Sequence, residues 1–398
     1  MQIGAELPEM HNTSCELHNA YDDVVKVRFV EIKYMEYLFN DVLEIKNGKN
    51  QKLVENPEGL YPIYGSGGII GYADKYICEA NTVIIGRKGS INNPIYVSEP
   101  FWNVDTAFGL SPKQDILLPR YLFYFCKNYN FEKLNKTVTI PSLTKADLLK
   151  IQIDLPSIDE QRRIVDKLIK VETIINLRNY QVQQLDDLIK ARFVEMFGDP
   201  ETNSKGWAEI SLSEKLNVLG GYAFKSDQFE ETGGIPVLRI GNINSGYFKP
   251  VNMVYWKEDR SLERYAMYPG DLVMSLTGTV GKDDYGNVCI LGNAYEMYYL
   301  NQRNAKLELK DGLDKYYLAE LLKFSQVKKK LTGISRGVRQ ANISNKDILN
   351  LVAPIPPMEL QQQFANFVEQ IAKSKATVQK ALDETQLLFD SLMQQYFG

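Results

Sequence analysis

Apolar residues recur at near-heptad spacing in two segments of the chain, one after residue 157 and one after residue 357. In the first segment these positions are Ile164, Leu168, Val171, Ile175, Val182, Leu185, Ile189 and Met196. The same register, shifted by 200 residues, gives Phe364, Val368, Ile371, Val378, Leu382, Phe389, Leu392 and Tyr396. The spacing predicts two amphipathic helices of about 39 residues, each about 58 Å long at 1.5 Å per residue.

The first of these helices has start and stop signals. Ser157 follows Pro156 and precedes Glu160 by three residues, which is the pattern of a capping box. Gly198 and Pro200 end the helical pattern. Because no Gly or Pro lies between these signals, we expect one uninterrupted helix.

Neither helix can bury its apolar stripe alone, so we expect the two to pack on each other as a coiled coil. The first helix delivers the chain to its second half and the second must run back, which predicts an antiparallel pair with pseudo-twofold symmetry. Four polar residues interrupt the seam between the helices: Arg178, Arg192, Lys375 and Thr385. We interpret them as side chains that reach solvent from a partly exposed seam; the alternative is that they select register or orientation.

The segment before each helix is predicted to be a mixed α/β block. The apolar run Thr82–Gly86 is typical of a buried strand and Pro119–Phe125 of a short aromatic helix. In the second half, Gly270–Ser275 and Lys315–Phe324 repeat this strand and this helix. The predicted fold class is therefore α/β, with two globular mixed α/β domains joined by two long antiparallel coiled-coil helices.

The two halves are related by a duplication with an offset of 200 residues. Residues 143–149 align with residues 343–349, and the register holds without a gap to Phe197-Gly198 and Phe397-Gly398. The blocks share pattern much more than sequence. We expect five segments: a tail at 1–25, a first domain at 26–154, a helical spacer at 155–198, a second domain at 199–354 and a second helical spacer at 355–398.

Composition narrows the class of protein only slightly. The formal net charge is −4, but residues 28–150 carry 15 bases and 13 acids, and residues 201–350 carry 20 and 18, so each block is weakly basic. The scattered cysteines are typical of reduced thiols, and the cluster of His11, Cys15 and His18 lacks a fourth metal ligand. Without an apolar run of about 20 residues or a signal peptide, we expect a cytoplasmic protein.

The motifs of common catalysts are absent or incomplete. Gly278–Lys282 has the wrong spacing for a phosphate-binding loop, and Asn93–Tyr96 lacks the second proline of an adenine-methyltransferase motif. Both histidines lie in the tail, and no isolated pair of carboxylates stands out for general acid–base work. The sequence therefore favours a recognition or scaffold protein without catalytic residues, bound metal or cofactor.

The ordered set of motifs resembles the specificity subunit of type I restriction-modification systems. Leu143–Leu148 followed by Leu155–Gln161 is similar to this family's entry into its central helix, and Pro356 and Gln361 repeat the pattern. Gly234–Ile243 and Ile85–Ser90 are similar to motifs of its target recognition domains. The resemblance covers about residues 28–398 and leaves 1–27 unexplained.

The resemblance implies a division of labour among subunits. Each block would be a target recognition domain that reads one half of a bipartite asymmetric site in double-stranded DNA. The helices would fix the spacer and dock two DNA methyltransferase subunits, and separate restriction and translocase subunits would join them. S-adenosylmethionine, ATP and magnesium would belong to those partners, with no membrane involved.

Candidate DNA contacts fall into three groups. Residues 328–342 hold five bases and no acid, which favours phosphate contacts by Lys328, Lys329, Lys330, Arg336, Arg339, Gln340 and Asn342, matched in the first half by Lys133, Lys136, Thr137, Thr139 and Ser142. Equivalent glycine-containing loops after the buried strands hold Arg87, Lys88, Ser90, Thr277, Thr279 and Lys282. Weaker candidates are Lys46, Lys49, Ser66, Tyr222, Lys225, Arg239, Asn242, Gln302 and Arg303.

Other interpretations stay open at this level. The basic segment is also typical of a solvated face, and the glycine loops are also typical of ordinary strand-end turns. A stand-alone DNA adenine methyltransferase would bind S-adenosylmethionine, and a coiled-coil adaptor would bind proteins instead of DNA. The pattern does not indicate which DNA sequence is recognised, because base contacts depend on the geometry of the loops.

Overall fold

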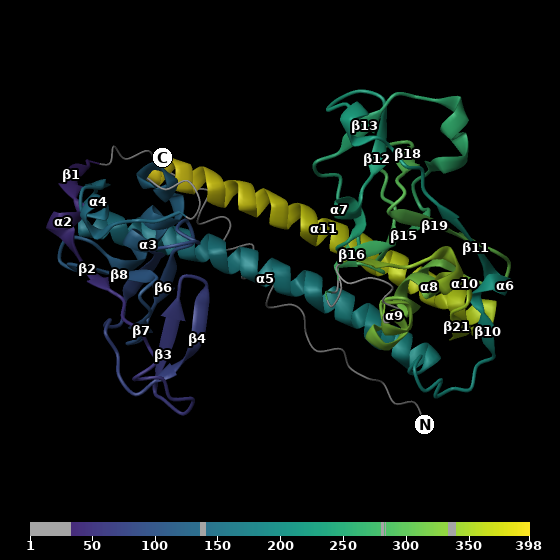
Figure 1. Cartoon of the computed structure of the whole chain (residues 1–398), viewed down its shortest axis with the longest axis horizontal. Helices are drawn as coiled ribbons and strands as arrows, with labels where there is room; N and C mark the ends of the chain where they lie inside the picture. The colour runs from purple at the N-terminus through teal and green to yellow at the C-terminus, as the bar shows by residue number, and fades with distance from the viewer. Residues whose placement is uncertain (1–32, 136–140, 280–281, 283, 333–339) are drawn as a thin grey trace. The chain divides into compact units, whose positions relative to one another are not determined.

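Two compact units make up the protein in the computed structural model, which describes residues 33–135, 141–279, 282, 284–332 and 340–398. Unit 1 comprises Met1–Tyr180 with Gln379–Gly398, and unit 2 comprises Gln181–Val378. Each unit contains one end of each of two 40-residue helices, α5 (Ile158–Phe197) and α11 (Met358–Phe397), which are drawn in Figure 1. The two long helices predicted from the heptad spacing are confirmed.

Unit 1 contains two larger sheets and a two-stranded one, in which Met35–Leu38 pairs with Gln152–Leu155. Four antiparallel strands form one sheet in the order β2-β8-β5-β6, and a smaller sheet has the order β4-β3-β7. Its elements before α5 are β1 (Met35–Leu38), α2 (Phe39–Val42), β2 (Leu43–Asn47), β3 (Tyr61–Gly65), β4 (Gly68–Ala73), β5 (Thr82–Gly86), β6 (Ile95–Val97), β7 (Trp102–Asn103), β8 (Ala107–Pro112), α3 (Pro119–Asn128), η1 (Phe131–Leu134), α4 (Lys145–Leu148) and β9 (Gln152–Leu155).

Unit 2 repeats the four-stranded antiparallel sheet in the order β11-β19-β15-β17, with a second sheet in the order β13-β12-β18-β14. Its elements are β10 (Glu209–Ser211), α6 (Leu212–Lys215), β11 (Leu216–Gly220), η2 (Ser226–Gln228), β12 (Ile235–Leu238), α7 (Ile240–Ile243), β13 (Val254–Trp256), η3 (Arg260–Tyr265), β14 (Ala266–Met267), β15 (Leu272–Ser275), β16 (Thr277–Thr279), β17 (Val288–Ile290), β18 (Tyr298–Leu300), β19 (Asn304–Leu309), α8 (Lys315–Leu321), α9 (Ser325–Thr332), β20 (Gln340–Asn342), α10 (Asn345–Leu349) and β21 (Val352–Pro354).

The strands and short helices predicted at the centre of each block are confirmed. All five residues of β5 are buried, as are all four of β15, which fits their continuous apolar sequences. Helix α3 covers the predicted aromatic helix, and α8 covers most of its counterpart in the second half. The duplication extends to the entry helices, because Thr144 caps α4 and Ser344 caps α10 through the backbone N–H of the Asp three residues on.

Both ends of α5 follow the sequence signals. The backbone N–H of Glu160 donates to Ser157 Oγ at 3.3 Å, so Ser157 caps the helix as predicted. At the other end Gly198 has a φ of +80°, a left-handed conformation that glycine adopts without a steric penalty. Glycine at this position therefore permits the helix to end where it does.

A buried glutamine ties each long helix to its own unit. Gln161 Nε2 donates to the carbonyl oxygens of Ile116 and Pro156, and its Oε1 accepts from the backbone N–H of Leu118 at 2.9 Å. In unit 2, Gln361 Nε2 donates to the carbonyls of Gly312 and Pro356, and its Oε1 accepts from Asp314 N at 2.8 Å: the same three bonds. Both glutamines are fully buried, so these bonds fix the start of each helix against the turn that precedes α3 or α8.

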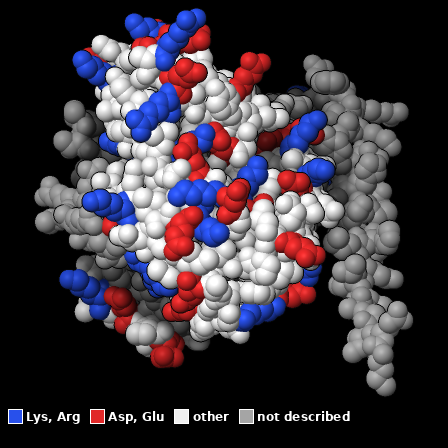
Figure 2. Space-filling view, turned by 90° about the vertical axis from the view of Figure 1, so that its right-hand side faces the viewer, with Lys and Arg blue, Asp and Glu red and all other residues white. Residues whose placement is uncertain are grey.

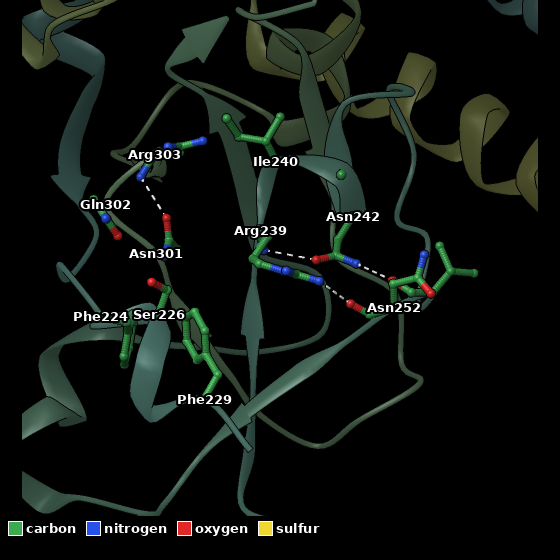
Figure 3. Close-up of a pocket in the computed structure, with 12 residues that line it drawn as sticks. Phe224, Ser226, Phe229, Arg239, Ile240, Asn242, Asn252, Asn301, Gln302 and Arg303 are labelled. Carbon is green, nitrogen blue, oxygen red and sulfur yellow. Dashed lines mark hydrogen bonds between the residues drawn. The ribbon is translucent and has the colours of Figure 1, made fainter. Parts of the chain in front are cut away.

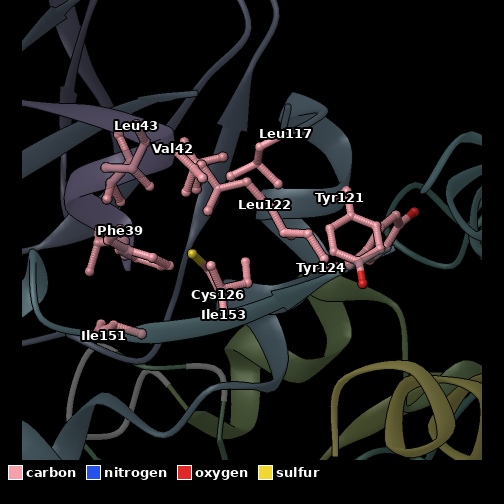
Figure 4. Packing of buried hydrophobic residues seen from close by; sticks show 14 of the residues in the cluster. Phe39, Val42, Leu43, Leu117, Tyr121, Leu122, Tyr124, Cys126, Ile151 and Ile153 are labelled. Carbon is pink, nitrogen blue, oxygen red and sulfur yellow. The ribbon is translucent and has the colours of Figure 1, made fainter. Parts of the chain in front are cut away.

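The core of each unit incorporates residues from both long helices. Figure 4 shows Leu122 and Cys126 of α3 packed near Phe39 and Ile153 in unit 1. The same cluster includes residues of both helix ends, namely Ile164, Val165, Leu168, Val171, Phe389, Leu392, Met393 and Tyr396. In unit 2, Phe193 of α5 packs against Phe364 of α11 with ring centroids 5.5 Å apart. The apolar stripes are thus buried against the domains as well as against each other.

Within each unit, polar pairs cross the seam between α5 and α11. In unit 1, Arg178 donates to Thr385 Oγ1 and to the carbonyl of Ala381. In unit 2, Lys375 Nζ lies 2.6 Å from Asp186 Oδ1. Thr385 is fully buried, so the interpretation that it reaches solvent is wrong. Arg178 and Lys375 are half-buried, and each also bonds across the seam.

Arg192 bonds within its own helix, to Glu195 at 2.8 Å. In unit 1 Lys167 contacts Tyr396 while Arg178, further along α5, contacts the earlier residue Thr385 of α11. In unit 2 Asp186 and Phe193 contact Lys375 and Phe364 in the same opposite order, so the helices are antiparallel in each unit. Among the described residues no helix is both long and apolar enough to cross a membrane.

Candidate nucleic-acid interface

In unit 2, three sequence-predicted residues come together at the end of the second sheet. The turn between β18 and β19 holds Gln302 and Arg303, both exposed. The backbone N–H of Gln302 donates to the Tyr222 carbonyl at 2.9 Å, and Tyr222 forms a parallel bridge with Asn301. Tyr222, Gln302 and Arg303 therefore form one surface, although Tyr222 lies far from the other two along the chain.

The loop after β12 forms the opposite side of this surface. Asn242 is buried; its Oδ1 accepts from the backbone N–H of Arg239 at 2.9 Å, and its Nδ2 donates to the carbonyls of Lys249 and Val251. The Arg239 guanidinium donates to the carbonyl of Asn252. Asn242 was a candidate DNA contact, but its side chain is occupied in holding the loop, so we assign it a positioning role.

Between these two elements lies a cavity of about 560 Å³. Figure 3 shows Arg239 on one side, with Gln302 and Arg303 on the other and Phe224 and Phe229 at one end. Lys225 is exposed and lies between two lining residues, Phe224 and Ser226. The cavity combines arginines, amides and aromatic rings, the groups that contact base edges and stack on bases in protein–nucleic-acid complexes.

The glycine loop of unit 2 pairs with the segment that leads to α10. Thr277 lies opposite Asn342 and Thr279 opposite Gln340 in the β16–β20 ladder. Asp284 Oδ1 accepts from Thr279 N at 2.8 Å, and this bond lowers the pKa of the Asp284 carboxyl. Lys282 is exposed on the same loop. Thr277, Thr279, Gln340 and Asn342 are therefore brought together as backbone neighbours.

In unit 1, the glycine loop approaches the β3–β4 hairpin. A side chain at Gly86 would come within 3.1 Å of Ser66 Cβ and 2.3 Å of the Ser90 carbonyl, so glycine permits this close approach. Arg87 and Lys88 follow on the loop, and Lys88 bridges to Ser142. Ser66, Arg87, Lys88 and Ser90 thus form a cluster, in which the two basic residues are exposed.

The remaining unit 1 candidates lie near the end of β2. Lys49 is exposed, and its backbone N–H donates to the carbonyl of Asn103 at 3.0 Å. Lys46 is half-buried, and its Nζ lies 3.4 Å from the carbonyl of Ile77. Lys49 is therefore better placed than Lys46 to contact an external ligand.

Several candidates lie outside the described residues: Lys136, Thr137, Thr139, Arg336 and Arg339, the tail at 1–25 with His11, Cys15 and His18, and part of the glycine loop at 280–281. Lys133, Lys329 and Lys330 are described and exposed. Lys328 is buried, and its Nζ donates to Asn287 Oδ1. A phosphate contact by Lys328 is therefore not expected, because its ammonium group is held inside the unit.

The sequence pattern missed a second cavity in unit 2. It has a volume of about 510 Å³, and four lysines line it: Lys282, Lys323, Lys328 and Lys329. The lysine run at 328–330 and Lys282 of the glycine loop were the sequence signals near it. Figure 2 shows basic and acidic side chains interspersed on one face of the molecule, which fits the small net charge of each block.

The described residues provide no activated nucleophile among the cysteines. Cys78, Cys126 and Cys289 are buried, and desolvation raises the pKa of Cys78 and of Cys289 to about 12. At neutral pH these thiols are protonated. No group of three or more His, Cys, Asp or Glu side chains gathers as a metal site in this part of the chain.

The comparison with protein families decides the class of the protein. The family model described as the type I restriction modification DNA specificity domain matches the chain twice, over residues 31–186 and 204–385. The chain belongs to this family. As a specificity subunit it is a non-catalytic DNA recognition protein and not a stand-alone methyltransferase.

Several relatives are specificity subunits themselves. The chain is 27% identical to the MjaVIII type I restriction enzyme specificity subunit of Methanocaldococcus jannaschii, over 86% of this chain and 88% of that protein. It is 22% identical to the EcoKI specificity subunit of Escherichia coli K12, over 78% and 70%. The crystal structure of a type I system S subunit from M. genitalium has a TM-score of 0.59 at 18% identity and covers 94% of this chain and 98% of that one. The last likeness supports the fold.

Membership of the family also bears on cofactors and partners. A specificity subunit holds no cofactor of its own, which agrees with the absence of cofactor motifs in the sequence. Type I specificity subunits bind DNA and assemble with other restriction-modification subunits. The specificity subunit therefore has to present a DNA surface and a subunit surface.

Proposed function

We propose that each unit of the specificity subunit carries one target recognition domain, residues 26–154 and 199–354, and that each reads one half of a bipartite, asymmetric DNA site. The observation that supports this most directly is that candidate DNA contacts from separate segments of the chain come together in each unit. In each unit, candidates from separate segments meet where the strands of two neighbouring sheets end, at Ser66 and Arg87 in unit 1 and at Arg239 and Arg303 in unit 2. Because these residues differ between the units, the two half-sites differ too.

The helical segments 155–198 and 355–398 fix the spacer and dock the partners. The partners are two DNA methyltransferase subunits, which hold S-adenosylmethionine, and restriction and translocase subunits, which use ATP and magnesium. Apolar side chains exposed on the helices support a docking role: Leu177 is 44% exposed, Leu188 47% and Leu387 69%. Because the substrate is DNA, we expect the complex in the cytoplasm.

Loss of the gene tests the recognition role. Long-read mapping of methylated adenines, in cells with and without this gene, should show one bipartite motif that disappears with the gene and returns with a plasmid copy. A genome whose methylated motifs are unchanged by the deletion would refute the proposal. The same experiment identifies the DNA sequence read.

The weak charge predicts that the isolated chain binds DNA poorly. Each block carries a small positive charge, so few phosphate contacts are expected, and affinity has to come from partners that surround the duplex. A mobility-shift assay should show specific binding only after methyltransferase subunits are added. Tight, sequence-specific binding by the chain alone would contradict this.

The spacer role is tested by lengthening both helices together. Insertion just before Gly198 would displace Phe193 and Phe197 from the unit 2 core, so the better sites are Tyr180/Gln181 in α5 and Val378/Gln379 in α11. One added turn is about 5.4 Å, against about 3.4 Å per base pair, so the unread spacer should lengthen by about one or two base pairs. An insertion in α5 alone is the control, because it breaks the seam register. An unchanged spacer in the double insertion would refute this role.

A further inference from the structure

Two short turns occupy the same position in the two units. In unit 1 the turn between β7 and β8 is closed by a bond from Ala107 N to the Val104 carbonyl at 3.0 Å. In unit 2 the turn between β18 and β19 is closed by a bond from Asn304 N to the Asn301 carbonyl at 2.9 Å. Each turn follows a strand in parallel pairing with β3 or β12 and leads into the four-stranded sheet.

Neighbouring bonds set the two turns in register residue by residue. The glycine loop of unit 1 contacts its turn through Arg87 N, which donates to the Thr106 carbonyl at 2.7 Å. The glycine loop of unit 2 does the same through Leu276 N, which donates to the Arg303 carbonyl at 2.8 Å. Thr106 therefore corresponds to Arg303, and Asp105 corresponds to Gln302. The offset between these turns is slightly shorter than the constant offset that relates the long helices.

The side chains exposed on the two turns differ in hydrogen-bonding character. Asp105 is exposed and presents a carboxylate, which only accepts hydrogen bonds at neutral pH. Arg303 is exposed and presents a guanidinium, which only donates, and Gln302 next to it presents an amide. An arginine pairs with O6 and N7 of guanine, and an aspartate accepts from the amino group of cytosine.

A carboxylate facing DNA is informative because it cannot serve as a phosphate contact. Phosphates repel it, so its presence on a DNA-facing surface favours contact with a base amino group. The exposed basic residues Lys49, Arg87 and Lys88 belong to the same unit as Asp105. Those residues are suited to the flanking phosphates and leave the base edge to Asp105.

We propose that Asp105 and the pair Gln302-Arg303 are corresponding specificity determinants that read bases of opposite hydrogen-bond polarity in the two half-sites. Arg303 reads a guanine in the half-site of unit 2. Asp105 reads a base with a major-groove amino group, cytosine or adenine, in the half-site of unit 1. This rests on the proposed function, in which each unit reads one half-site.

An exchange of the two turns tests the assignment in the complete complex with its methyltransferase partners. The double variant Gln302→Asp with Arg303→Thr gives unit 2 the turn of unit 1, and Asp105→Gln with Thr106→Arg gives the reciprocal exchange. Each exchange should change one base position in the half-site of its own unit and leave the other half-site as it was. On synthetic duplexes, discrimination at that position should fall by about 10-fold to 100-fold, the range for a good bidentate contact.

A second substitution keeps the test decisive where an exchange fails to fold. Arg303→Lys retains the charge but loses the planar fork, so discrimination against other bases should fall while the salt dependence of binding stays the same. Lys257→Thr is the control for the charge that Arg303→Thr removes in the exchange, since it removes one exposed positive charge of unit 2 outside the cavity and should leave discrimination unchanged.

Three results would overturn the inference. These are an unchanged motif in a folded exchange variant, an equal loss of methylation on matched and mismatched duplexes, and wild-type discrimination by Arg303→Lys. The gene deletion separates this inference from the proposed function. A motif that survives deletion refutes both, whereas a motif that is lost on deletion but unaffected by the exchanges refutes only the turn assignment.

Discussion

Unit 1 and unit 2 share a four-stranded sheet and a helix attachment but close their smaller sheets in different ways. In unit 1 the strands β3 and β4 are joined by Ser66 and Gly67 alone. In unit 2 the corresponding connection from β12 to β13 spans residues 239–253 and includes the helical turn α7. That long connection forms one side of the 560 Å³ cavity.

The difference shows which parts of the fold are constrained. The glutamine attachment makes the same three bonds in both units, and the capped entry helices recur at the same offset as the long helices. Connections between strands lie at the surface and tolerate changes in length at low energetic cost. Two copies of one framework can therefore present unlike recognition surfaces without changing how the helices attach.

The largest expected effect is the loss of stability on removing the buried side-chain amide of Gln161 or Gln361, which both units share. Gln161→Met and Gln361→Met each leave one N–H and two carbonyls without a partner, at about 1–3 kcal/mol per unsatisfied group. The free energy of unfolding should fall by about 3 kcal/mol or more. Urea denaturation measures the loss, and hydrogen exchange should localise it to the unit that carries the change.

The exposed Gln386 of α11 supplies the control for these variants. Gln386→Met should have little effect on stability, because it removes only an exposed side-chain bond to Asp390. If Gln161→Met and Gln361→Met cost no more than this control, the attachment role is wrong.

The connection that differs between the units, residues 239–253 in unit 2, is tested at Asn242. Asn242→Ala removes the amide that holds the 239–253 loop and should destabilise unit 2 by about 1–3 kcal/mol. It should also weaken discrimination in the half-site of unit 2 alone. The unit 1 counterpart, Ser66→Ala, lies in a two-residue turn and should change stability very little. Methylation kinetics on duplexes altered in one half-site measure this discrimination. An effect of Asn242→Ala on the half-site of unit 1 would contradict the prediction.

The two seams should differ in their response to salt. Arg178→Met removes, among its contacts, the hydrogen bonds to Thr385 and to the carbonyl of Ala381 in unit 1 and should cost about 1 kcal/mol, with less dependence on salt than an ion pair. Lys375→Met removes an ion pair in unit 2 whose partner Asp186 is 44% exposed, so the loss should be about 0.5 kcal/mol and shrink as salt is raised. Unfolding curves at low and high salt measure both; equal salt dependence would contradict this distinction.

The smallest expected effect comes from the glycine loop of unit 2. Its Asp284 carboxyl has a lowered pKa, so the stabilisation it provides is complete above its ordinary value of 3.8 and is lost only as pH falls through the lowered pKa. Asp284→Asn keeps an acceptor for Thr279 N, removes one negative charge, and should raise DNA affinity of the assembled complex by about twofold. The ratio of the DNA affinities of wild type and Asp284→Asn should stay constant from pH 6 to pH 8, because Asp284 is ionised throughout this range. A ratio that changes with pH would refute the lowered pKa of Asp284.

The long helices and central strands could be predicted because their signals are local and repeated. Heptad spacing located α5 and α11 almost to the residue, and continuous apolar runs located β5 and β15. The duplication also predicted that Gln161 and Gln361 would be equivalent. These features depend on periodicity and on pairs of residues at constant separation, which a sequence displays directly.

The recognition surfaces could be predicted only in part. The sequence indicated Arg239 and Arg303 but gave no reason to place them across one cavity, because strand pairing brings them together from distant parts of the chain. It also could not show that Asn242 is buried or that Lys328 bonds to Asn287. The equivalence of Asp105 and Gln302 was hidden, because loops of unlike length shift their offset away from that of the helices.

The distribution of the two long helices between the units has a consequence for folding during synthesis. Unit 2 is continuous in sequence, whereas the core of unit 1 includes Phe389, Leu392 and Tyr396, which are translated after all of unit 2. Domains generally fold as they leave the ribosome, beginning with the first one made. Here the order should be reversed, with residues 33–180 waiting for residues 379–398. Proteolysis of chains truncated at residue 380 and released from the ribosome would test this, since unit 2 should resist cleavage while unit 1 remains sensitive.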